Sequence, residues 1–507
     1  MSEGRYLYHK EQLPSYRAGM GTTYGRPKHM TYRLLVLALT ATLVALAGDP
    51  AAAAIGTAPN RSADLSGYAR DGYHPQSVPE SGLPYNDGPL APRVDPNPHD
   101  DQGVRLFSYN GQTYNHPVAQ AQWGLSNLRT YLANRDQLFL DRAMAQAQRN
   151  LDRRVESRLA WWYSYEFDFP RCSQMPVVRA PWYSAMAQGQ LLSLFARLYM
   201  VTRDQKWREA ADRTFASLLL PPATGLPWAG WVDDAGYLWL EEYPVTPGVT
   251  GERVLNGHIF ALYGAYDYWR LTGDQRAVAL FDGAATTLRR HVPSTFRAPQ
   301  WISRYSIGCP TSYASYHPVH IGQLLKTYEL TRAPVFAALA DLFREDYPTP
   351  AVSGTVVFSG GAHVGYRFSS TGSVLEQKSL TLSRQSQANA DQRIRVPGRG
   401  IHYRMSNGAL AGFLVPETPG ERILLGAVVR HSYAPQRTLW FSAGTYTGHR
   451  YGATWNVVES KTFTFPRSSA APFDATAWVN GRMSYRITAG VYAGFWVPVH
   501  DGLAPAP

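Results

Sequence analysis

Two adjacent carboxylic acids and a tyrosine stand together near the middle of the chain, in the stretch LWLEEYPVTPGVTGERVLNGHIFALYG at 238–264. Glu241, Glu242 and Tyr243 follow three large apolar residues, and an apolar helix is expected to start at about Val254. Burial and like charge push the pKa values of adjacent acids apart, which prepares groups for acid–base chemistry. The residue types therefore indicate a candidate acid–base site, with a solvated loop before an ordinary helix as the alternative.

Short polar turns indicate which elements hold this stretch. The turns are ANRDQ at 133–137, TRDQ at 202–205, TGDQ at 272–275 and TRAP at 331–334. On both sides of each turn, apolar residues recur with the period of an α-helix. The turns themselves recur every 60 to 70 residues or so, which is about the length of one helical hairpin. Asp136, Asp204 and Asp274 suit helix N-caps, and Pro334 suits a first helical position. The pattern predicts four helical hairpins at 114–350 that form an all-α (α/α) toroid or incomplete barrel.

A polar, aromatic motif introduces the first helix of each hairpin. The motifs are YNHPVAQAQWGL at 114–125, APWYSAMAQGQ at 180–190, EEYP with VLNG at 241–257, and SYHPVHIGQL at 315–324. The first and the fourth match each other in His-Pro-Val followed by Gln. In an alternating toroid the starts of all first helices lie at one end, so the motifs are expected to converge on one mouth. Helix N-termini gathered there favour a substrate that carries carboxylates.

From 351 onward the sequence changes to Gly, Ser, Thr and alternating β-formers, and a second repeat appears. VFSGGAHVGYRF at 357–368 matches WFSAGTYTGHRY at 440–451, and YRMSNGALAGFLVP at 403–416 matches YRITAGVYAGFWVP at 485–498. The repeat predicts two tandem all-β modules, 351–430 and 431–507. Their shared aromatic residues are assigned to the core, with polysaccharide or cell-wall binding as the functional alternative.

The N-terminal residues have the anatomy of a secretory signal peptide. LLVLALTATLVALA at 34–47 follows a basic flank, precedes a run of alanines and is short for a membrane span. Met30 stands where such a signal normally begins, which makes 1–29 an upstream extension; a short membrane anchor is the alternative. We therefore expect an extracellular protein, with 1–54 as extension and signal. Residues 55–113, rich in Pro, Gly, Asn and Asp, are expected to pack on the next domain as an extended segment.

Composition points to an acidic polymer as the partner. The 507 residues include 14 Trp and 32 Tyr, an excess that often lines sugar-binding clefts, and the net charge of +11 suits a polyanion. No Lys/Arg-rich block or zinc-finger spacing is present, which argues against nucleic acid. Cys172 and Cys309 are expected to pair in an oxidising compartment, with two free thiols as the alternative, and they form no metal pattern.

The helical region resembles the catalytic C-terminal domain of D-glucuronyl C5-epimerases. The matching motifs are WWYSYEFDFP at 161–170, PWYSAMAQGQ at 181–190, EEYPVTP with VLNG, and YHPVHIGQL at 316–324. The resemblance implies inversion of C5 in glucuronic acid residues of an acidic polysaccharide, giving iduronic acid, without a nucleotide or redox cofactor. No metal ligand is assigned. The polymer is open, with a heparin-type glycosaminoglycan precursor as the first hypothesis, and the oligomeric state is open too, a dimer included.

The resemblance ascribes catalysis to tyrosines. They correspond to Tyr243 after the double Glu, Tyr316 before His317, and Tyr305 in WISRYSIG. Inversion needs one group to remove the C5 proton from one face and another to deliver a proton to the opposite face. A phenol is a natural acid, but as a base it needs a lowered pKa. Glu242 is a further catalytic candidate, either as the base or as the group that orients Tyr243.

Further residues are predicted to bind the substrate. His317 and Arg304 are candidates to hold its carboxylate, and aromatic side chains to line the cleft. The full set is Asn115, His116, Trp162, Tyr165, Trp182, Tyr183, Gln188, Glu241, Asn256, Arg304, His317, His320 and Gln323. For the histidines and glutamines of the last helix the alternative is helix packing, and for the aromatic residues it is a place in the core.

Two other functions remain open. A uronic-acid polysaccharide lyase on a similar toroid makes the same C5 carbanion and then expels the C4 oxygen. A secreted polysaccharide-binding protein without activity is the second, although the intact EEYP and YHPVH motifs argue against it. Animal members of the family carry a β domain before the helices, whereas here the β modules follow them.

Overall fold

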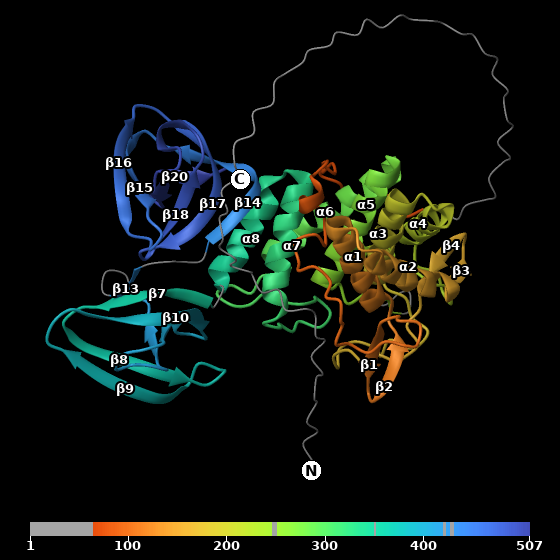
Figure 1. Ribbon diagram of the computed structural model, residues 1–507, viewed down its shortest axis with the longest axis horizontal. Coiled ribbons are helices and arrows are strands. Elements are labelled where there is room, and N and C mark those ends of the chain that lie inside the picture. The colour runs from red at the N-terminus through yellow and green to blue at the C-terminus, as the bar shows by residue number, and fades with distance from the viewer. Residues whose placement is uncertain (1–63, 246–250, 349–350, 419–421, 426–429, 507) are drawn as a thin grey trace, which may run out of the picture. The chain divides into compact units, whose positions relative to one another are not determined.

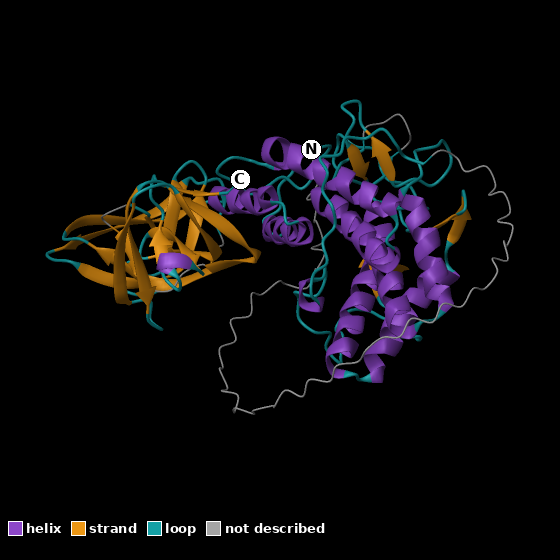
Figure 2. Ribbon diagram, turned by 90° about the horizontal axis from the view of Figure 1, so that it is seen from above, coloured by secondary structure: helices purple, strands orange, loops and turns teal. Residues whose placement is uncertain are grey.

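The computed structural model describes residues 64–245, 251–348, 351–418, 422–425 and 430–506. Within these residues, eight α-helices come first along the chain and two seven-stranded sheets follow (Figure 1 and Figure 2). The expected extension and signal segment, 1–54, lies outside the described residues. No helix in the described part of the chain combines the length and the apolar character needed to cross a membrane.

The helices form four hairpins, as the repeated turns predict. They are α1 (Pro117–Asn134) with α2 (Gln137–Asp152), α3 (Ala185–Thr202) with α4 (Gln205–Leu218), α5 (Leu255–Thr272) with α6 (Gln275–His291), and α7 (Tyr316–Thr331) with α8 (Pro334–Asp346). The carboxylates of Asp136, Asp204 and Asp274 accept a backbone N–H from two residues on, at 3.1, 3.1 and 2.8 Å. Pro334 is the first residue of α8. The hairpins are confirmed, and their curvature into a toroid stays a prediction.

The first helix of a hairpin is buried on most sides, and the second shows a polar face. In α3 every residue from Ala185 to Leu198 is buried, whereas α4 buries one face. The helices α3 and α5 meet through glycine: a Cβ on Gly189 would lie 2.5 Å from Ala261 Cα, and one on Gly264 would lie 2.5 Å from Gly189 Cα. This backbone contact sets the spacing of the second and third hairpins.

Residues 64–105 lie against the helices, where the Leu65 N–H bonds to the Leu219 carbonyl and the Gln76 N–H to the Leu330 carbonyl. The expected extended segment at 55–113 stays a prediction. Arg197 of α3 donates to the Pro84 carbonyl at 2.9 Å, and Lys326 of α7 donates to the Gly82 carbonyl at 2.8 Å. A single 3-10 turn, η1 (Glu80–Gly82), lies within residues 64–105. The segment therefore connects two hairpins that are distant in sequence.

Small two-stranded sheets lie among the helices. They are β1 (Leu106–Tyr109) with β2 (Gln112–Asn115), β3 (Val155–Ser157) with β4 (Ala160–Trp162), and β5 (Gly230–Val232) with β6 (Leu238–Leu240). A π-helical turn, η2 (Val292–Phe296), follows α6. Because β6 ends directly before Glu241, its pairing with β5 fixes where the two acids begin.

Two antiparallel sheets form the rest of the described chain. The first contains β7 (Ala351–Phe358), β8 (Gly361–Phe368), β9 (Val374–Leu382), β10 (Ser386–Val396), β11 (Gly400–Met405), β12 (Leu414–Pro416) and β13 (Arg422–Leu425), in the order β13-β7-β10-β11-β12-β8-β9. The second contains β14 (Arg430–Phe441), β15 (Gly444–Tyr451), β16 (Val457–Phe465), β17 (Ser469–Val479), β18 (Arg482–Ile487), β19 (Trp496–Pro498) and β20 (Leu503–Pro505), in the order β16-β15-β19-β18-β17-β14-β20, with the 3-10 turn η3 (Gly490–Tyr492) before β19.

The two sheets share local irregularities as well as sequence. The β8–β9 register shifts between Arg367 and Phe368, and the β15–β16 register shifts between Arg450 and Tyr451. An arginine beside each shift pairs with a glutamate on the neighbouring strand, at 2.7 Å in the first sheet and 2.8 Å in the second. The structure therefore has one sheet for each predicted module.

The second sheet bonds to the fourth hairpin through side chains. The Tyr433 hydroxyl of β14 donates to the Asp341 carboxylate of α8 at 2.6 Å, and Arg437 pairs with the same carboxylate at 2.5 Å. The Tyr328 hydroxyl of α7 donates to the Pro435 carbonyl at 3.0 Å. A buried aromatic and an ion pair thus join β14 to α7 and α8.

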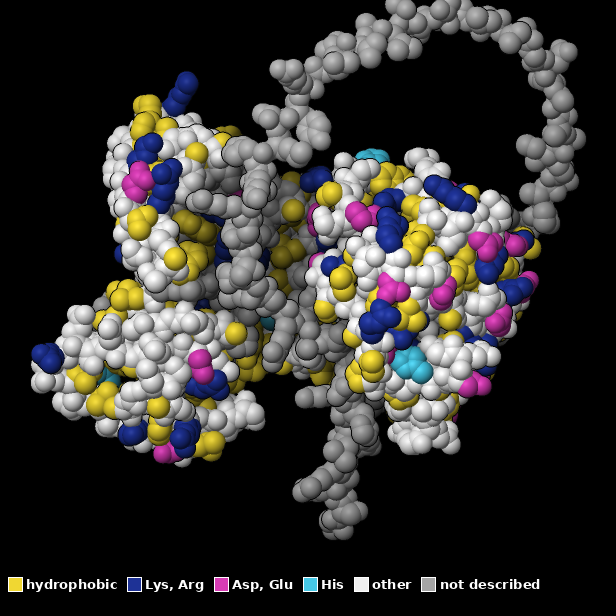
Figure 3. All heavy atoms as spheres, viewed as in Figure 1, with side chains coloured by type: hydrophobic (Ala, Val, Ile, Leu, Met, Phe, Trp, Pro, Cys, Tyr) yellow, Lys and Arg dark blue, Asp and Glu magenta, His cyan; other side chains and the backbone are white. Residues whose placement is uncertain are grey.

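Charge is mixed on the face of the molecule that Figure 3 shows. Lys and Arg side chains there are interspersed with Asp and Glu over the helices and the sheets. The net positive charge of the chain therefore forms no single patch on that face.

Candidate active site

Glu241 is a buried carboxyl that holds the loop before α5. Its two side-chain oxygens accept the Arg253 backbone N–H at 2.9 and 3.1 Å, and its carbonyl accepts the Ala185 N–H at 2.8 Å. A Cβ on Gly251 would lie 2.1 Å from one of its carboxylate oxygens, so a larger residue there would displace the carboxylate. Burial raises the pKa of Glu241 to about 7, although the Arg253 N–H partly offsets the effect. Glu241 therefore joins the EEYP motif to the loop before VLNG.

Glu242 points the other way, toward a group of phenols. Its Oε1 accepts a hydrogen bond from the Tyr305 hydroxyl at 3.3 Å, and the residue is 7% exposed. A Cβ on Gly257, the glycine of VLNG, would lie 2.2 Å from its Oε2. The close approach of α5 to this carboxylate therefore requires glycine and explains why the two motifs occur together.

Three tyrosines from the third and fourth hairpins form one cluster. The Tyr243 and Tyr305 hydroxyl oxygens are 3.4 Å apart, and the rings of Tyr305 and Tyr316 meet at 4.7 Å between centroids. Tyr243 and Tyr305 are buried, whereas Tyr316 is half-buried. Burial, and next the Glu242 carboxylate, raise the pKa of Tyr305 well above its ordinary value near 10. Tyr305 is therefore a protonated hydrogen-bond donor at neutral pH.

A cation, Arg171, covers this cluster. Its guanidinium carbon lies 4.0 Å from the centre of the Tyr243 ring and 5.8 Å from that of Tyr305. Glu252, which is fully buried, holds it through two hydrogen bonds of 2.7 and 2.9 Å. Burial alone would lower the pKa of Arg171, but Tyr243 and Glu252 raise it above its ordinary value, so the group stays charged.

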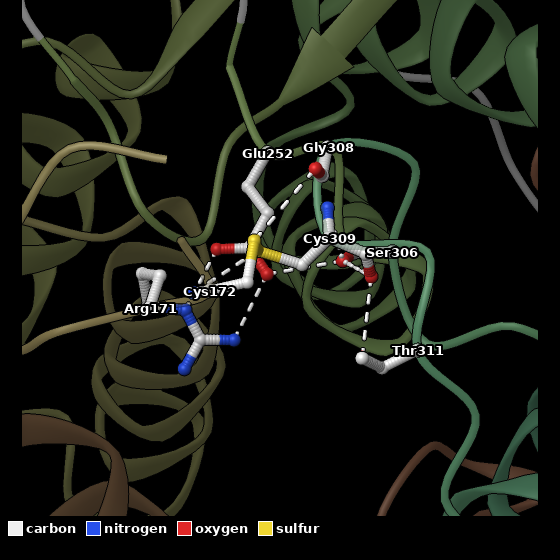
Figure 4. The surroundings of a disulfide bond; sticks show 7 residues. All are labelled: Arg171, Cys172, Glu252, Ser306, Gly308, Cys309 and Thr311. Carbon is white, nitrogen blue, oxygen red and sulfur yellow. Dashed lines mark hydrogen bonds and ion pairs between the residues drawn. A yellow bond between two sulfur atoms is a disulfide. The ribbon is translucent and has the colours of Figure 1, made fainter. Parts of the chain in front are cut away.

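The predicted disulfide is confirmed, and it explains how Arg171 reaches the tyrosines. Cys172 and Cys309 are bonded across 137 residues of sequence (Figure 4). Figure 4 shows Arg171 beside Cys172, and Ser306 and Thr311 beside Cys309, with Glu252 between them. Ser306 and Thr311 belong to the loop 297–315 before α7, called the Tyr305 loop here. The Ser306 hydroxyl bonds to Glu252 at 3.0 Å. The arginine, its carboxylate and the Tyr305 loop are therefore tied together.

The two histidines of α7 differ in how many of their ring nitrogens make hydrogen bonds. His317 accepts the Ser303 N–H at Nδ1, at 2.9 Å, while its Nε2 donates to the Phe343 carbonyl at 3.0 Å. Both ring nitrogens are thus bound to backbone, and His317 links the Tyr305 loop to α8. His320 bonds to the Ser303 hydroxyl at 2.8 Å through Nδ1, and its buried Nε2 has no partner among the described residues. Burial lowers the pKa of His320 to about 3, so it is neutral.

Asn256 and Gln323 meet between α5 and α7. The Gln323 amide donates to the Asn256 carbonyl at 3.1 Å. Asn256 Oδ1 and Gln323 Oε1 are buried and make no hydrogen bond within the described parts of the chain. With His320 Nε2 they give three buried atoms that are free to bind a hydroxyl or an N–H group.

An aromatic wall continues the cluster on the side of the first two hairpins. Trp182 stacks on Tyr165 at 3.9 Å and lies 5.8 Å from the Tyr243 ring. His116, the N-cap of α1, packs edge-on to Tyr165 at 4.8 Å. Phe167 and Phe169 complete the wall. These residues bring the starts of three hairpins against one another.

The remaining predicted residues lie elsewhere. Gln188 bonds to the Trp161 carbonyl at 2.8 Å and to Ser217 at 2.6 Å, inside the helical core. Trp162 is fully buried and packs against Tyr183, outside the cluster of Tyr243, Tyr305 and Tyr316. Asn115 accepts from Gln120 and Arg149, and Arg304 donates to the Thr295 carbonyl at 3.1 Å. The structure does not bring these side chains into the cluster.

Arg171 and Ser303 were missed by the sequence reasoning. Arg171 stands next to Cys172, so the expected pairing with Cys309 already placed it beside the Tyr305 loop. Ser303, which bonds to both histidines of α7, has no comparable signal in the sequence.

Comparisons with solved structures give low scores. A GH76 α-mannanase of Bacteroides thetaiotaomicron is 13% identical with a TM-score of 0.33, over 49% of this chain and 62% of that chain. Cellobiose 2-epimerase from Bacillus thermoamylovorans is 12% identical with a TM-score of 0.36, over 48% of this chain and 63% of that chain. Scores of this size assign neither a fold nor an activity.

Comparisons at the level of sequence are more specific. Residues 156–345 match the family described as D-glucuronyl C5-epimerase C-terminus, a range that contains the tyrosine cluster and starts after α2. A D-glucuronyl C5-epimerase of Caenorhabditis elegans is 34% identical over 90 residues, which cover 18% of this chain and only 14% of that relative. The resemblance predicted from the motifs is therefore confirmed for residues 156–345, which are similar to the C-terminal domain of D-glucuronyl C5-epimerases.

Proposed function

We propose that this protein is a secreted isomerase of the D-glucuronyl C5-epimerase type, which inverts C5 of glucuronic acid residues in an acidic polysaccharide. The observation that carries the proposal is the cluster of Tyr243, Tyr305 and Tyr316 with Glu242. Two different hairpins contribute these side chains, and all of them lie in the residues that match the epimerase family.

The reaction needs two proton transfers on opposite faces of the sugar. The C5 hydrogen is α to a carboxylate and weakly acidic, so the electron pair left by its removal must be stabilised by the site. Tyr243 precedes α5 and Tyr316 begins α7, with Tyr305 between them. We assign removal of the C5 proton to one of these outer phenols and delivery to the opposite face to the other.

Tyr305 has a different role because it is held as a donor. Its single proton is directed to Glu242, so in the hydroxyl pair Tyr243 donates to the Tyr305 oxygen. A proton can then pass between Tyr243 and Glu242 through Tyr305. Glu242 is thereby connected to the chemistry without having to reach the sugar.

The sugar is expected to approach from the side of Tyr316. Tyr316 is the most exposed of the three phenols, since Tyr243 and Tyr305 are buried. His320, Asn256 and Gln323 carry the unpartnered buried atoms described above, which suit sugar hydroxyls. Binding of polysaccharide by the two β sheets stays a prediction without a site.

The test is to incubate the protein with glucuronate-containing polymers in heavy water. The proposal expects deuterium at C5 together with iduronate, and no chain cleavage. Unsaturated chain ends would instead show a lyase, which makes the same carbanion and expels the C4 oxygen. Binding without exchange would leave a polysaccharide-binding protein, and either result would overturn the epimerase.

A further inference from the structure

Arg171 is a charged side chain in the phenol cluster that the proposed proton transfers do not use. Its guanidinium lies over the face of the Tyr243 ring at 4.0 Å, and over Phe169 at 5.0 Å. The Tyr305 ring is further away, at 5.8 Å. The cation therefore lies closer to the Tyr243 ring than to the Tyr305 ring, although the two hydroxyls are neighbours.

The position of Arg171 is fixed on two sides. Glu252 binds it in a bidentate fashion and is itself bound by the Ser306 hydroxyl. On the other side the neighbouring Cys172 is bonded to Cys309. A guanidinium held by a fork of two hydrogen bonds has little freedom to follow another partner. Its charge is therefore a permanent part of the environment of Tyr243.

The two phenols have different charged groups as their close neighbours. Tyr243 faces Arg171, Tyr305 and the aromatic rings of Phe169 and Trp182. Tyr305 faces the Glu242 carboxylate and Tyr316 as well. Glu252 binds the guanidinium that covers the Tyr243 ring. An adjacent cation favours an ionised phenol and an adjacent carboxylate opposes it.

We propose that Arg171 is a positioning residue that makes Tyr243, and not Tyr305, the phenol that ionises and accepts the C5 proton. The inference rests on the proposed function, because it names the base of that reaction. The C5–H bond breaks, the proton passes to the Tyr243 oxygen, and the electron pair stays on the sugar and its carboxylate. Tyr243 is then the base of the reaction, and Tyr316, the other outer phenol, delivers the proton to the opposite face.

The first test is the pH profile of C5 exchange in Arg171→Met and Arg171→Lys. Loss of an opposite charge at this distance should move the alkaline rise in rate upward by roughly 1 to 3 pH units in Arg171→Met. Arg171→Lys keeps the charge and should move it less. Arg393→Met is the matched control, because Arg393 also binds a glutamate twice, at 2.7 and 3.0 Å, and lies 4.1 Å over Trp478. That variant should keep the wild-type profile.

The second test needs no turnover. It therefore tests the effect of Arg171 on Tyr243 separately from the proposed epimerase reaction. Tyrosinate absorbance is titrated in the full-length protein, and the difference from Tyr243→Phe isolates the signal of Tyr243. Arg171→Met should move that signal to higher pH. Glu252→Gln should move it to lower pH, because the guanidinium then lacks its counter-charge. If the Tyr243 titration shifts in opposite directions in these two variants but the protein has no epimerase activity, the electrostatic inference stands and the proposed function is wrong.

Two results would overturn the inference. One is a Tyr243 titration that stays in place in both the Met and the Lys variant, whatever their activity. The other is an Arg171→Met enzyme that is slow but has the wild-type pH profile, which would give Arg171 a structural role alone. If the Met variant does not fold, the Lys variant and Glu252→Gln still predict shifts of different size and opposite sign.

Discussion

The starts of the first and fourth hairpins share the letters His-Pro-Val and a later Gln, yet they place their side chains differently. In the first hairpin the helix begins at Pro117, and His116 caps it by accepting the Ala119 N–H at Nδ1. In the fourth the helix begins two residues earlier in the match, at Tyr316, so the histidine lies inside the first turn. His317 then turns toward Ser303 and α8 rather than toward its own helix end.

The position of the helix boundary, and not the shared motif, therefore decides which residue faces the cluster. The first hairpin has Asn115 where the fourth has Tyr316, and Asn115 is bound to Gln120 and Arg149. The fourth hairpin presents a phenol to Tyr305 instead. The ionisable groups therefore gather on the third and fourth hairpins, and the first contributes aromatic packing.

The largest effect is expected from the tyrosine that distinguishes the two starts. Tyr316→Phe should lower C5 exchange by on the order of 10² to 10⁴, because it removes a proton-transfer group and keeps the ring. Asn115→Ala, at the matching position, should lower it far less. Deuterium exchange in the same polymer measures both. Equal losses in the two variants would contradict the division between the hairpins.

A second difference is that a disulfide anchors the loop before the fourth hairpin. Cys172→Ser with Cys309→Ser should lower the free energy of unfolding by about 2 to 4 kcal/mol, since it removes the cross-link. Denaturant unfolding with and without reductant measures this. The wild type should lose stability in reductant and the double variant should not change. A double variant as stable as the wild type would show that the start of the fourth hairpin does not depend on the disulfide.

The start of the fourth hairpin carries a titratable His320 where the first hairpin has Ala119, so only the fourth should respond to pH at this position. The pKa of His320 is about 3 in the folded protein and 6.5 ordinarily, so below 6.5 the unfolded chain binds the extra proton. Stability is therefore lost as the pH falls from 6.5 toward 3. His320→Gln should flatten that loss by up to about 1.4 kcal/mol per pH unit. Unfolding at about pH 7 and about pH 4.5 gives the slope, and parallel curves would contradict it.

The smallest effect concerns the caps themselves. His116→Ala removes a side chain that accepts a first-turn N–H and should cost about 1 kcal/mol of stability. Ser315→Ala should cost almost nothing, because Ser315 precedes α7 without a side-chain cap bond. Thermal unfolding of the two variants measures the pair. A larger loss for Ser315→Ala would reverse the assignment of the caps.

Much of the fold could be predicted because its signals are local. The Asp136, Asp204 and Asp274 caps mark the turns, and each is made by residues two apart. The repeat of alternating residues likewise predicts one sheet per module. The packing of one hairpin against the next has no such local signal, since it depends on contacts such as the one between Gly189 and Gly264.

Part of the site could also be predicted, because short motifs mark its residues. The three tyrosines and Glu242 came from motifs of the family, and the structure brings them together. The roles of His317 and Arg304 in holding a carboxylate could not be judged from the sequence, because their partners Ser303 and Thr295 are set by loop conformation. The expected Cys172–Cys309 bond placed Arg171 near the Tyr305 loop, but its position over the Tyr243 ring also depends on Glu252, which no motif marks.

The two close glycines next to the acids have a consequence for how this sequence can vary. The space beyond the Gly251 backbone is filled by the Glu241 carboxylate, and the space beyond Gly257 by that of Glu242. A methyl group at either position would displace the acid that it faces, so each glutamate and its glycine must be inherited together. Among sequences that show EEYP, those with a larger residue in place of the VLNG glycine should have lost the second acid's position. The pair is thus a filter for recognising true relatives of this site in uncharacterised genomes.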